Sequence, residues 1–360
     1  MPSPHIDKVT DPATVLLTGA SGFVGSVILD RLVQSGVPVR VLALPETVAG
    51  LLHRDRITLF EGSLSDRDLL ARATAGVRVV YHFGAALPTS DTALIIEVNV
   101  RGTENLLAAA AAGKVTRFVH ASSMAVYDPV VRRSRWPITE EFPLQAPGRR
   151  ARSHYPRSKV EAEALVKRTH DESGMEYVIL RFPIVYGLGA PLVEDYIKTL
   201  LGRPRVLTTG AADSPGMQWV HVEDLAEATV LAGTRPEAAN QVFNISGADV
   251  FSMRNLLEAV AEQKGTPLPP VRERRPFMKA FAERMRRNTA LKYDITKAEA
   301  KLGFRAKDDL RTTLRAIAAD MDRRGLLPET IGADPDTNPR ALVETLRAIA
   351  QSRPGRRGAI

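Results

Sequence analysis

A tyrosine and a lysine stand four residues apart in the segment SHYPRSK, as Tyr155 and Lys159. On a helix this spacing places both side chains on one face about one turn apart, so a phenol and an ammonium group could act on the same bound molecule. Pro156 follows the tyrosine directly, and proline is tolerated in the first turn of a helix, where its missing N–H would have no partner. Such a pair also occurs by chance, so the surrounding elements must decide what it does.

The composition is that of an ordinary globular chain. With 360 residues, 44% hydrophobic and 25% charged, it favours one large α/β domain with an appendage, or two domains sharing an interface. The chain has no cysteine, which excludes disulfides, thiolate catalysis and cysteine-based metal sites, and we expect no metal. The N-terminus lacks a signal-peptide pattern, and the longest apolar run, residues 106–112, is too short to span a bilayer. We therefore expect a cytoplasmic protein without membrane contact.

Arginine clusters account for most of the formal net charge of +8. They lie at residues 132–135, 149–152, 272–275 and 284–287. Nucleic-acid binding would pair such clusters with a reading helix or with interleaved aromatic side chains, and neither accompanies them. We therefore expect no nucleic-acid partner and interpret the clusters as solvated faces. The alternative is that Arg149, Arg150 and Arg152, just before the tyrosine, draw an anionic small-molecule substrate.

Segments typical of strands and helices alternate through the first half of the chain. Strands are expected at residues 15–17, 37–44, 56–62, 77–86, 117–123 and 176–182, and helices at 26–34, 66–76, 99–112 and 156–172. This alternation predicts an α/β fold with a doubly wound parallel sheet of the Rossmann type. After Tyr186 proline and glycine become frequent, which predicts a smaller, mixed C-terminal lobe that binds substrate.

These patterns predict a division of the chain into three parts. They are a dinucleotide-binding domain at 12–185 to which 219–249 returns, a substrate-binding lobe at 186–218 and 250–325, and a C-terminal extension at 326–360. Within the extension we expect a short helix at 339–351 and a mobile tail.

The segment TGASGFVG lies between the first expected strand and the first expected helix, and it supplies Gly19, Gly22 and Gly25. Glycines at this place let the backbone turn tightly and approach a pyrophosphate, while the helix N-terminus favours its negative charge. The strand-turn-helix context makes a dinucleotide site the preferred interpretation over a plain tight turn.

The glycine spacing resembles the Thr-Gly-x-x-Gly-x-x-Gly form of the extended short-chain dehydrogenase/reductase family, of the NAD-dependent epimerase/dehydratase type. Further segments fall in the family's order: HFGAA, NVRGTENLL, SSMAVY, YPRSK, RFPIVYG, WVHVEDLA, FNISG and YDITKAEAKLGF. The resemblance implies a nicotinamide cofactor whose C4 carries a hydride to or from a carbon of a small molecule.

Within this resemblance Tyr155 gives or takes the proton at a substrate carbonyl or alcohol. A tyrosine with an ordinary pKa of about 10 is a poor base near neutrality, so it needs a nearby positive charge. Lys159 is expected to supply that charge and to bind the nicotinamide ribose. Ser123 is expected to donate a hydrogen bond to the substrate oxygen, with Ser122 as the alternative.

The resemblance also implies a set of cofactor-binding positions. They are Gly19, Ser21, Gly22, Phe23, Val24, Gly25, Ser63, Leu64, Gly84, Ala85, Ala86, Asn99, Ser122, Tyr155, Lys159, Phe182, Pro183 and Val185. Ser63 stands where many relatives carry Asp, and Asn99 is expected either to brace the backbone or simply to cap a helix. Ala43 and Leu44 occupy the places where an acid would favour NAD and an arginine NADP, so the cofactor is NAD or NADP.

Other positions bear on the reaction. Dehydratases of the family carry Asp-Glu directly after the serine, whereas this chain has Met124 and Ala125. Epimerases that hold a nucleoside diphosphate sugar typically use an Asn and an Arg where this chain has Ile184 and Met217. Because charge-assisted phosphate contacts are among the stronger hydrogen bonds, their loss argues against that substrate class.

The sequence therefore favours an NAD(P)-dependent oxidoreductase acting on a hydroxyl or carbonyl of a small molecule. A nucleotide-sugar or related sugar epimerase with tightly bound NAD is the first alternative, and a non-catalytic NAD(P)-binding scaffold or sensor is the second. A homodimer is expected only by analogy with relatives that pair through two helices.

Overall fold

The computed structural model describes residues 14–88, 91–128, 137–145, 154–201, 216–266, 268, 292–307 and 309–327. Several expectations lie outside these residues: the four arginine clusters, the helix at 339–351 and the C-terminal tail.

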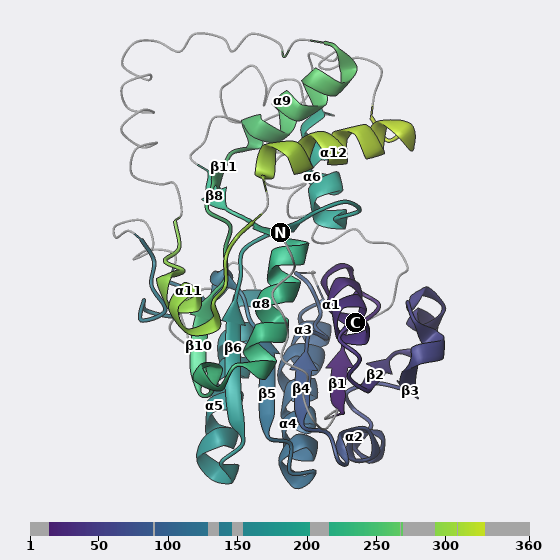
Figure 1. Ribbon diagram of the computed structural model, residues 1–360, viewed down its shortest axis with the longest axis vertical. Coiled ribbons are helices and arrows are strands. Elements are labelled where there is room, and N and C mark those ends of the chain that lie inside the picture. The colour runs from purple at the N-terminus through teal and green to yellow at the C-terminus, as the bar shows by residue number, and fades with distance from the viewer. Residues whose placement is uncertain are drawn as a thin grey trace.

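A seven-stranded parallel sheet forms the centre of the molecule (Figure 1), in the order β10-β6-β5-β4-β1-β2-β3. Its strands are β1 (Val15–Thr18), β2 (Val39–Ala43), β3 (Ile57–Glu61), β4 (Val79–His82), β5 (Arg117–Ala121), β6 (Glu176–Arg181) and β10 (Gln241–Asn244). All six neighbouring pairs run parallel. The central strands β1, β4 and β5 are buried along their whole length, as is typical of a parallel sheet that helices cover on both faces.

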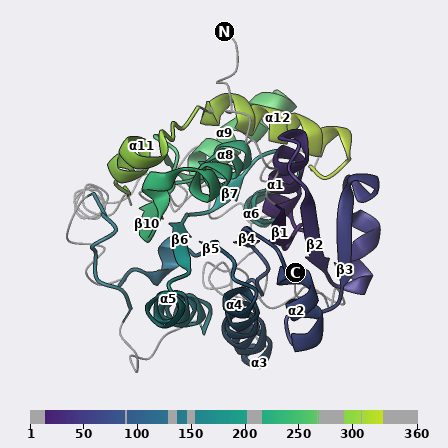
Figure 2. The same cartoon turned by 60° about the horizontal axis from the view of Figure 1, so that its bottom comes forward.

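Helices cover both faces of this sheet (Figure 2). On one face lie α2 (Arg67–Thr74), α4 (Thr103–Ala112) and α5 (His154–Ser173), and on the other lie α1 (Phe23–Gln34) and α8 (Val222–Thr234). Each layer of helices closes its own apolar core against the sheet. The predicted doubly wound Rossmann fold is confirmed.

Short elements connect these layers. They are α3 (Thr92–Ile96), the 3-10 turns η1 (Pro45–Gly50), η2 (Arg54–Arg56), η4 (Met124–Val126) and η7 (Pro236–Ala238), and the π-helical turn η3 (Glu97–Gly102) between α3 and α4. A π-helical turn interrupts the regular hydrogen-bond ladder and is frequent at functional sites. The expected helix at 99–112 therefore begins within an irregular turn.

A smaller group of elements packs at one end of the sheet (Figure 1). It contains β7 (Val185–Tyr186), α6 (Pro191–Leu201), β8 (Met217–Gln218), β9 (Val220–His221), β11 (Val250–Phe251), α9 (Met253–Lys264) and α12 (Leu310–Arg323), while α11 (Thr296–Leu302) lies beside β10. Tyr186, Trp219 and Phe251 belong to the core of this group, and the Trp219 and Phe251 ring centroids lie 4.1 Å apart. The mixed lobe expected from the sequence is present in the described residues.

Within the described residues, no helix is long and apolar enough to cross a membrane.

Candidate functional site

The glycine loop between β1 and α1 is packed too tightly for side chains. Gly19 has a φ of +78°, and a Cβ added there would lie 2.6 Å from the carbonyl carbon of Phe83. A Cβ added at Gly25 would lie 1.9 Å from the Gly19 carbonyl oxygen. The Gly22 N–H donates to that same oxygen over 3.1 Å, and Gly22 is the N-cap residue of α1. This arrangement brings backbone amides and a helix N-terminus to one place, which suits a pyrophosphate.

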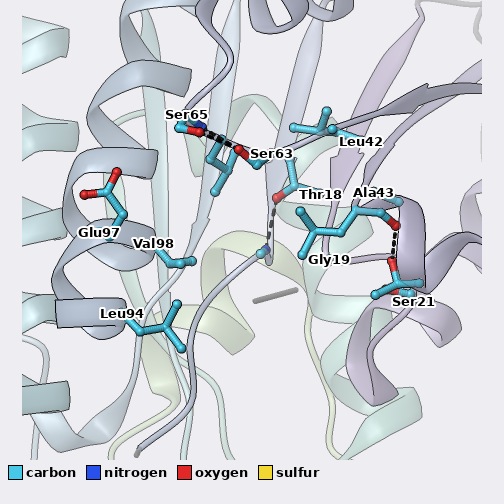
Figure 3. Close-up of a pocket in the computed structure, with 15 residues that line it drawn as sticks. Thr18, Gly19, Ser21, Leu42, Ala43, Ser63, Ser65, Leu94, Glu97 and Val98 are labelled. Carbon is cyan, nitrogen blue, oxygen red and sulfur yellow. Dashed lines mark hydrogen bonds between the residues drawn. The ribbon is translucent and has the colours of Figure 1, made fainter. Parts of the chain in front are cut away.

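A cavity of about 230 Å³ lies beside this loop (Figure 3). Of the expected cofactor positions, its lining includes Gly19, Ser21, Ser63, Leu64 and Gly84. It also includes residues that sequence reasoning did not assign, namely Thr18, Leu42, Thr47, Gly62, Ser65, Leu94, Glu97 and Val98. Because the cavity joins the glycine loop to the ends of β2 and β3, it fits the adenosine half of a dinucleotide.

The charge of this cavity does not select between the two nicotinamide dinucleotides. Ala43 and Leu44 line it where an acid or an arginine would discriminate. Among its described lining residues only Glu97 is charged, and Glu97 pairs with Arg101 at 3.1 Å. Ser63 accepts from the Ser65 N–H and its hydroxyl lies 2.6 Å from that of Ser65, so hydroxyl groups occupy the place of the family's acid.

A neutral hydrogen-bond chain holds the carboxyl end of β4. The Gly84 N–H donates to the Thr18 hydroxyl (3.0 Å), which lies 2.8 Å from Nδ1 of His82. His82 Nε2 lies 2.9 Å from the Thr103 hydroxyl, and that hydroxyl donates to the Asn99 carbonyl. Since the Thr103 proton is already used, His82 must donate from Nε2 and accept at Nδ1. Burial, and then the charge of Lys159, lower the His82 pKa to about 3, so the ring is neutral.

Asn99 braces the next part of this segment. Its Oδ1 accepts from the Ala86 N–H at 2.7 Å, and its Nδ2 donates to the Ala86 carbonyl and to the Ser158 hydroxyl, both at 3.0 Å. Ser158 in turn donates to the Tyr155 carbonyl at 2.8 Å. One amide from the π-helical turn η3 therefore connects the Gly84–Ala86 segment to the first turn of α5.

Tyr155 and Ser123 come together at the edge of the site. Tyr155 lies in the first turn of α5, and Ser123 follows the end of β5. Burial raises the pKa of Tyr155 to about 12, and a hydrogen bond with the Ser123 side chain lowers it in part. Ser123 also accepts from the Ala125 N–H over 3.1 Å, which fixes its rotamer. The tyrosine and the serine expected from the sequence are thus in contact.

Lys159 lies one turn further along α5 and is 4% exposed. Its ammonium donates to the Ala121 carbonyl at 2.9 Å and lies 5.9 Å from the centroid of the Tyr155 ring. Burial lowers the pKa of Lys159 to about 8, and the charge of Glu163 raises it in part. In this structure the lowering influence on the Tyr155 pKa comes from Ser123, whereas the sequence led us to expect it from Lys159.

The alternative serine has another partner. Ser122 is 1% exposed and its hydroxyl donates to Glu163 Oε1 over 2.5 Å. Its single proton is therefore committed to a buried carboxylate rather than to the space beside Tyr155. Of the two serines considered, the structure presents Ser123 to the tyrosine.

The remaining expected cofactor positions lie around the site rather than in the cavity. Phe182 stacks on Phe83 with centroids 6.3 Å apart, and Val185 belongs to the short strand β7. Phe23 and Val24 begin α1, and a Cβ added at Gly187 would lie 3.3 Å from the Phe23 ring. The other expected positions, Ala85 and Pro183, follow β4 and β6 in the chain.

A second, charged network lies beneath Lys159, and sequence reasoning missed it. Glu163 accepts from Arg181 Nε at 2.9 Å and from Nη2 at 2.6 Å, and both side chains are 2% exposed. Arg181 Nη1 donates to the Tyr127 hydroxyl, which donates to Asn244 Oδ1 over 2.5 Å. Two sequence signals could have pointed to it: a carboxylate four residues after Lys159 on the same helical face, and an arginine ending the apolar strand EYVILRF.

The glycine loop, the cavity beside it and the Ser123–Tyr155–Lys159 cluster are together typical of an NAD(P)-dependent enzyme of the Rossmann type. A family described as "NAD dependent epimerase/dehydratase family" matches residues 15–246, more than half of the chain. The chain therefore belongs to that family, as the resemblance to extended short-chain dehydrogenase/reductases implied.

Individual relatives differ in the reactions that their names describe. A 4-hydroxy-2-methyl-3-oxo-4-farnesyl-3,4-dihydroquinoline-1-oxide ketoreductase of Stigmatella aurantiaca is 31% identical over 260 residues, covering 69% of this chain and 72% of that protein. A dTDP-glucose 4,6-dehydratase of Streptomyces griseus is 28% identical over 325 residues, covering 85% and 93%. The crystal structure of UDP-glucose 4-epimerase from Brucella ovis in complex with NAD matches with a TM-score of 0.69 at 26% identity, covering 85% of this chain and 97% of that one.

Proposed function

We propose that the protein reduces a carbonyl group, or oxidises the corresponding alcohol, on an apolar small molecule with NAD(P) as the hydride carrier. The observation that carries this choice of substrate is that Ile184 and Met217 stand where relatives that hold a nucleoside diphosphate have an Asn and an Arg. Epimerisation of a nucleotide sugar is the competing function within the same family.

Three residues are assigned roles in this reaction. In the reducing direction the bound nicotinamide supplies a hydride to the carbonyl carbon. Tyr155 donates its phenolic proton to the carbonyl oxygen, and Ser123 donates a hydrogen bond to the same oxygen. Lys159, one turn away, stabilises the phenolate that remains until the proton is replaced from solvent. In the oxidising direction each transfer is reversed.

The residues next to Ser123 are apolar where a nucleotide sugar would need polar groups. Met124 is buried in a cluster with Tyr127, Ile138 and Tyr293, and Met217 packs against this cluster. Ile184 packs against the core that contains Tyr186 and Trp219. Ile184 and Met217 are half-buried, and neither can donate a hydrogen bond to a diphosphate. These two positions therefore offer a substrate apolar contacts instead.

Two exposed leucines add apolar surface in segments that follow β4 and β7. Leu87, in the segment after β4, is 54% exposed, and Leu188, in the segment after β7, is 59% exposed. The segment with Leu87 follows the carboxyl end of β4, and ligands of open α/β sheets bind at such strand ends. The ketoreductase relative from Stigmatella aurantiaca, whose name describes a farnesylated ring ketone, supports an apolar substrate.

The domain division and the assembly state are also proposals. The pairing of β10 with β6 supports assigning residues 219–249 to the dinucleotide-binding domain. A homodimer remains a prediction from analogy, and light scattering of the purified protein would check it.

To test this proposal, we would compare candidate substrates and follow the reaction by the absorbance of the reduced nicotinamide. We expect lasting consumption of NADH or NADPH with an apolar ring ketone such as a 3-ketosteroid, and none with UDP-glucose. Tyr155→Phe, which keeps the ring and removes the proton, should lower the rate by about 10²- to 10⁴-fold. NADH affinity of this variant, measured by fluorescence, should stay near that of the unmodified protein.

Two outcomes would contradict the proposal. Conversion of UDP-glucose to its 4-epimer without net change of nicotinamide would establish the epimerase instead. Full activity of Tyr155→Phe would remove the proton-transfer role.

A further inference from the structure

We propose that Glu163 is a positioning residue of this site: its buried carboxylate keeps Lys159 in the ammonium form and fixes the strand end that carries Ser123. The inference rests on the roles proposed above for Tyr155, Lys159 and Ser123. It adds a residue that touches neither substrate nor cofactor and acts through the residues that do.

The carboxylate of Glu163 is fully occupied and its orientation is fixed. Arg181 holds both oxygens, through Nε at 2.9 Å and Nη2 at 2.6 Å, and Ser122 adds a hydrogen bond of 2.5 Å to Oε1. All three side chains are almost entirely buried. A bidentate pair with an additional donor has little freedom to rotate, so the negative charge stays where it is.

Glu163 stands in a defined position relative to Lys159. The two residues are four apart on α5, so their side chains are neighbours on one helical face. The titratable and charged groups around Lys159 are Tyr155 and Glu163 on its own helix, His82 on β4, His120 on β5 and Arg181 on β6.

Only one of these groups raises the pKa of Lys159 against the lowering effect of burial. Burial lowers the pKa of both histidines, so they are neutral, and Arg181 is a second cation. Among these described groups Glu163 is therefore the one anion, and its charge raises the pKa of Lys159 against the effect of burial. Without Glu163 the pKa of Lys159 would fall further, and the ammonium that stabilises the phenolate of Tyr155 would persist only to a lower pH.

The same carboxylate also anchors the backbone that presents Ser123. Ser122 is its direct neighbour in sequence and donates to Glu163, while the Ser122 N–H donates to the Leu180 carbonyl at 2.8 Å. The Met124 N–H donates to the Phe182 carbonyl at 3.0 Å. The strand end is thus held to β6 on both sides of Ser123, with Arg181 between the two anchor points.

The charge of Lys159 can be measured without any substrate. We would follow the Lys159 side chain by NMR over a range of pH in protein isotope-labelled at lysine, because the chemical shift of the ε-carbon changes when the ammonium loses its proton. Glu163→Gln should move the titration midpoint of Lys159 to lower pH by about one to two units. Arg181→Met should move it to higher pH, because the anion is then no longer neutralised by the guanidinium.

The double variant Glu163→Gln/Arg181→Met is the matched control. It removes one negative and one positive charge together, so the midpoint should return toward that of the unmodified protein. Lys198, exposed on α6, serves as an internal reference whose midpoint should not move in any variant. Circular dichroism checks that each variant is folded. The two single variants should shift the Lys159 midpoint in opposite directions, so one folded single variant is enough to test the proposal.

A kinetic measurement connects this charge to the reaction. Ketone reduction needs the protonated Tyr155–Lys159 pair, so the alkaline limb of the rate should move to lower pH in Glu163→Gln by a similar amount. An unmoved titration midpoint of Lys159 in a folded single variant overturns the role of Glu163 even if Tyr155→Phe is inactive. Full activity of Tyr155→Phe overturns the proposed function even if the midpoint moves, so the two failures are distinguishable.

Discussion

Two buried hydrogen-bond networks lie side by side under the carboxyl edge of the sheet, and they differ in charge. The network on the side of the proposed cofactor site, the cofactor side, runs from Thr18 through His82 to Thr103 and is neutral. The network on the side of the proposed catalytic residues, the catalytic side, contains Glu163 and Arg181, both ionised and both 2% exposed in their side chains. Neutral hydroxyl and imidazole groups serve to hold backbone in place, whereas buried charges also set the protonation of their neighbours.

The difference follows from what each network supports. On the cofactor side the backbone around Gly84 lies against the glycine loop, and the Gly84 N–H needs a hydrogen-bond acceptor, which the Thr18 hydroxyl provides. On the catalytic side a lysine must keep a positive charge at a place where it is 4% exposed, which is costly without an anion nearby. The comparison predicts that the two networks respond differently to loss of a partner and to acid.

The largest effect on stability should come from breaking the charged network on one side only. Arg181→Met leaves the Glu163 carboxylate buried and unpaired, and we expect the free energy of unfolding to fall by about 3–5 kcal/mol. Replacing both partners, as in Glu163→Gln/Arg181→Met, should cost much less because no uncompensated charge remains. Urea unfolding of the two variants measures the difference. Equal losses would mean that the pair acts through packing alone.

Acid should weaken the neutral network. The His82 pKa is lowered from 6.5 to about 3 by burial, and that of His120 is also lowered well below 6.5. Below about pH 6.5 the unfolded chain therefore binds protons that the folded chain does not, so stability falls as pH falls. Each histidine should contribute about 1.4 kcal/mol per pH unit, a slope that urea unfolding at several pH values would measure.

A substitution of His120 separates its contribution to this pH dependence of stability from that of His82. Among the described residues neither of its ring nitrogens has a hydrogen-bond partner, so His120→Leu removes no bond and should remove about half of the histidine slope. His154→Gln, at an exposed position, is the control and should leave the slope as it was. A slope that is unchanged in His120→Leu would show that this ring is already charged in the folded protein.

The smallest expected effect comes from removing a single hydroxyl of the neutral network. Thr18→Val keeps the shape but leaves the Gly84 N–H and His82 Nδ1 without their partner, at a cost of about 1–3 kcal/mol. Thr18→Ser retains the hydroxyl and should restore most of that stability. Affinity for NADH, followed by fluorescence, should fall in Thr18→Val and recover in Thr18→Ser. Equal NADH affinity in both variants would separate this hydroxyl from the cofactor site.

Most of the fold and part of the candidate site could be predicted from local sequence. The regular alternation of apolar runs and amphipathic segments predicts the parallel sheet, because each pattern has its own period. The segment TGASGFVG predicts a tight turn, since glycine is needed wherever a Cβ would clash, as at Gly19 and Gly25. The spacing between Tyr155 and Lys159 is likewise a local, helical property.

Partners from distant segments could not be predicted in this way. Glu163 and Arg181 are read separately as a charged helical residue and a charged strand end, and nothing local indicates that they pair. The same holds for Thr18 and His82, which are 64 residues apart in sequence. Arg149, Arg150 and Arg152, expected as the mouth of the site, lie outside the described residues and stay a prediction.

The sequence by itself determined the class of fold, the family and the cofactor loop, because these depend on spacing and residue type along one short segment at a time. The tertiary structure decided which serine faces Tyr155, which tautomer His82 adopts, and which anion accompanies Lys159. Each of these depends on side chains that strands β4, β5 and β6 bring together only after they have paired, and hydrogen bonds and charges act over a few ångströms whatever the separation in sequence.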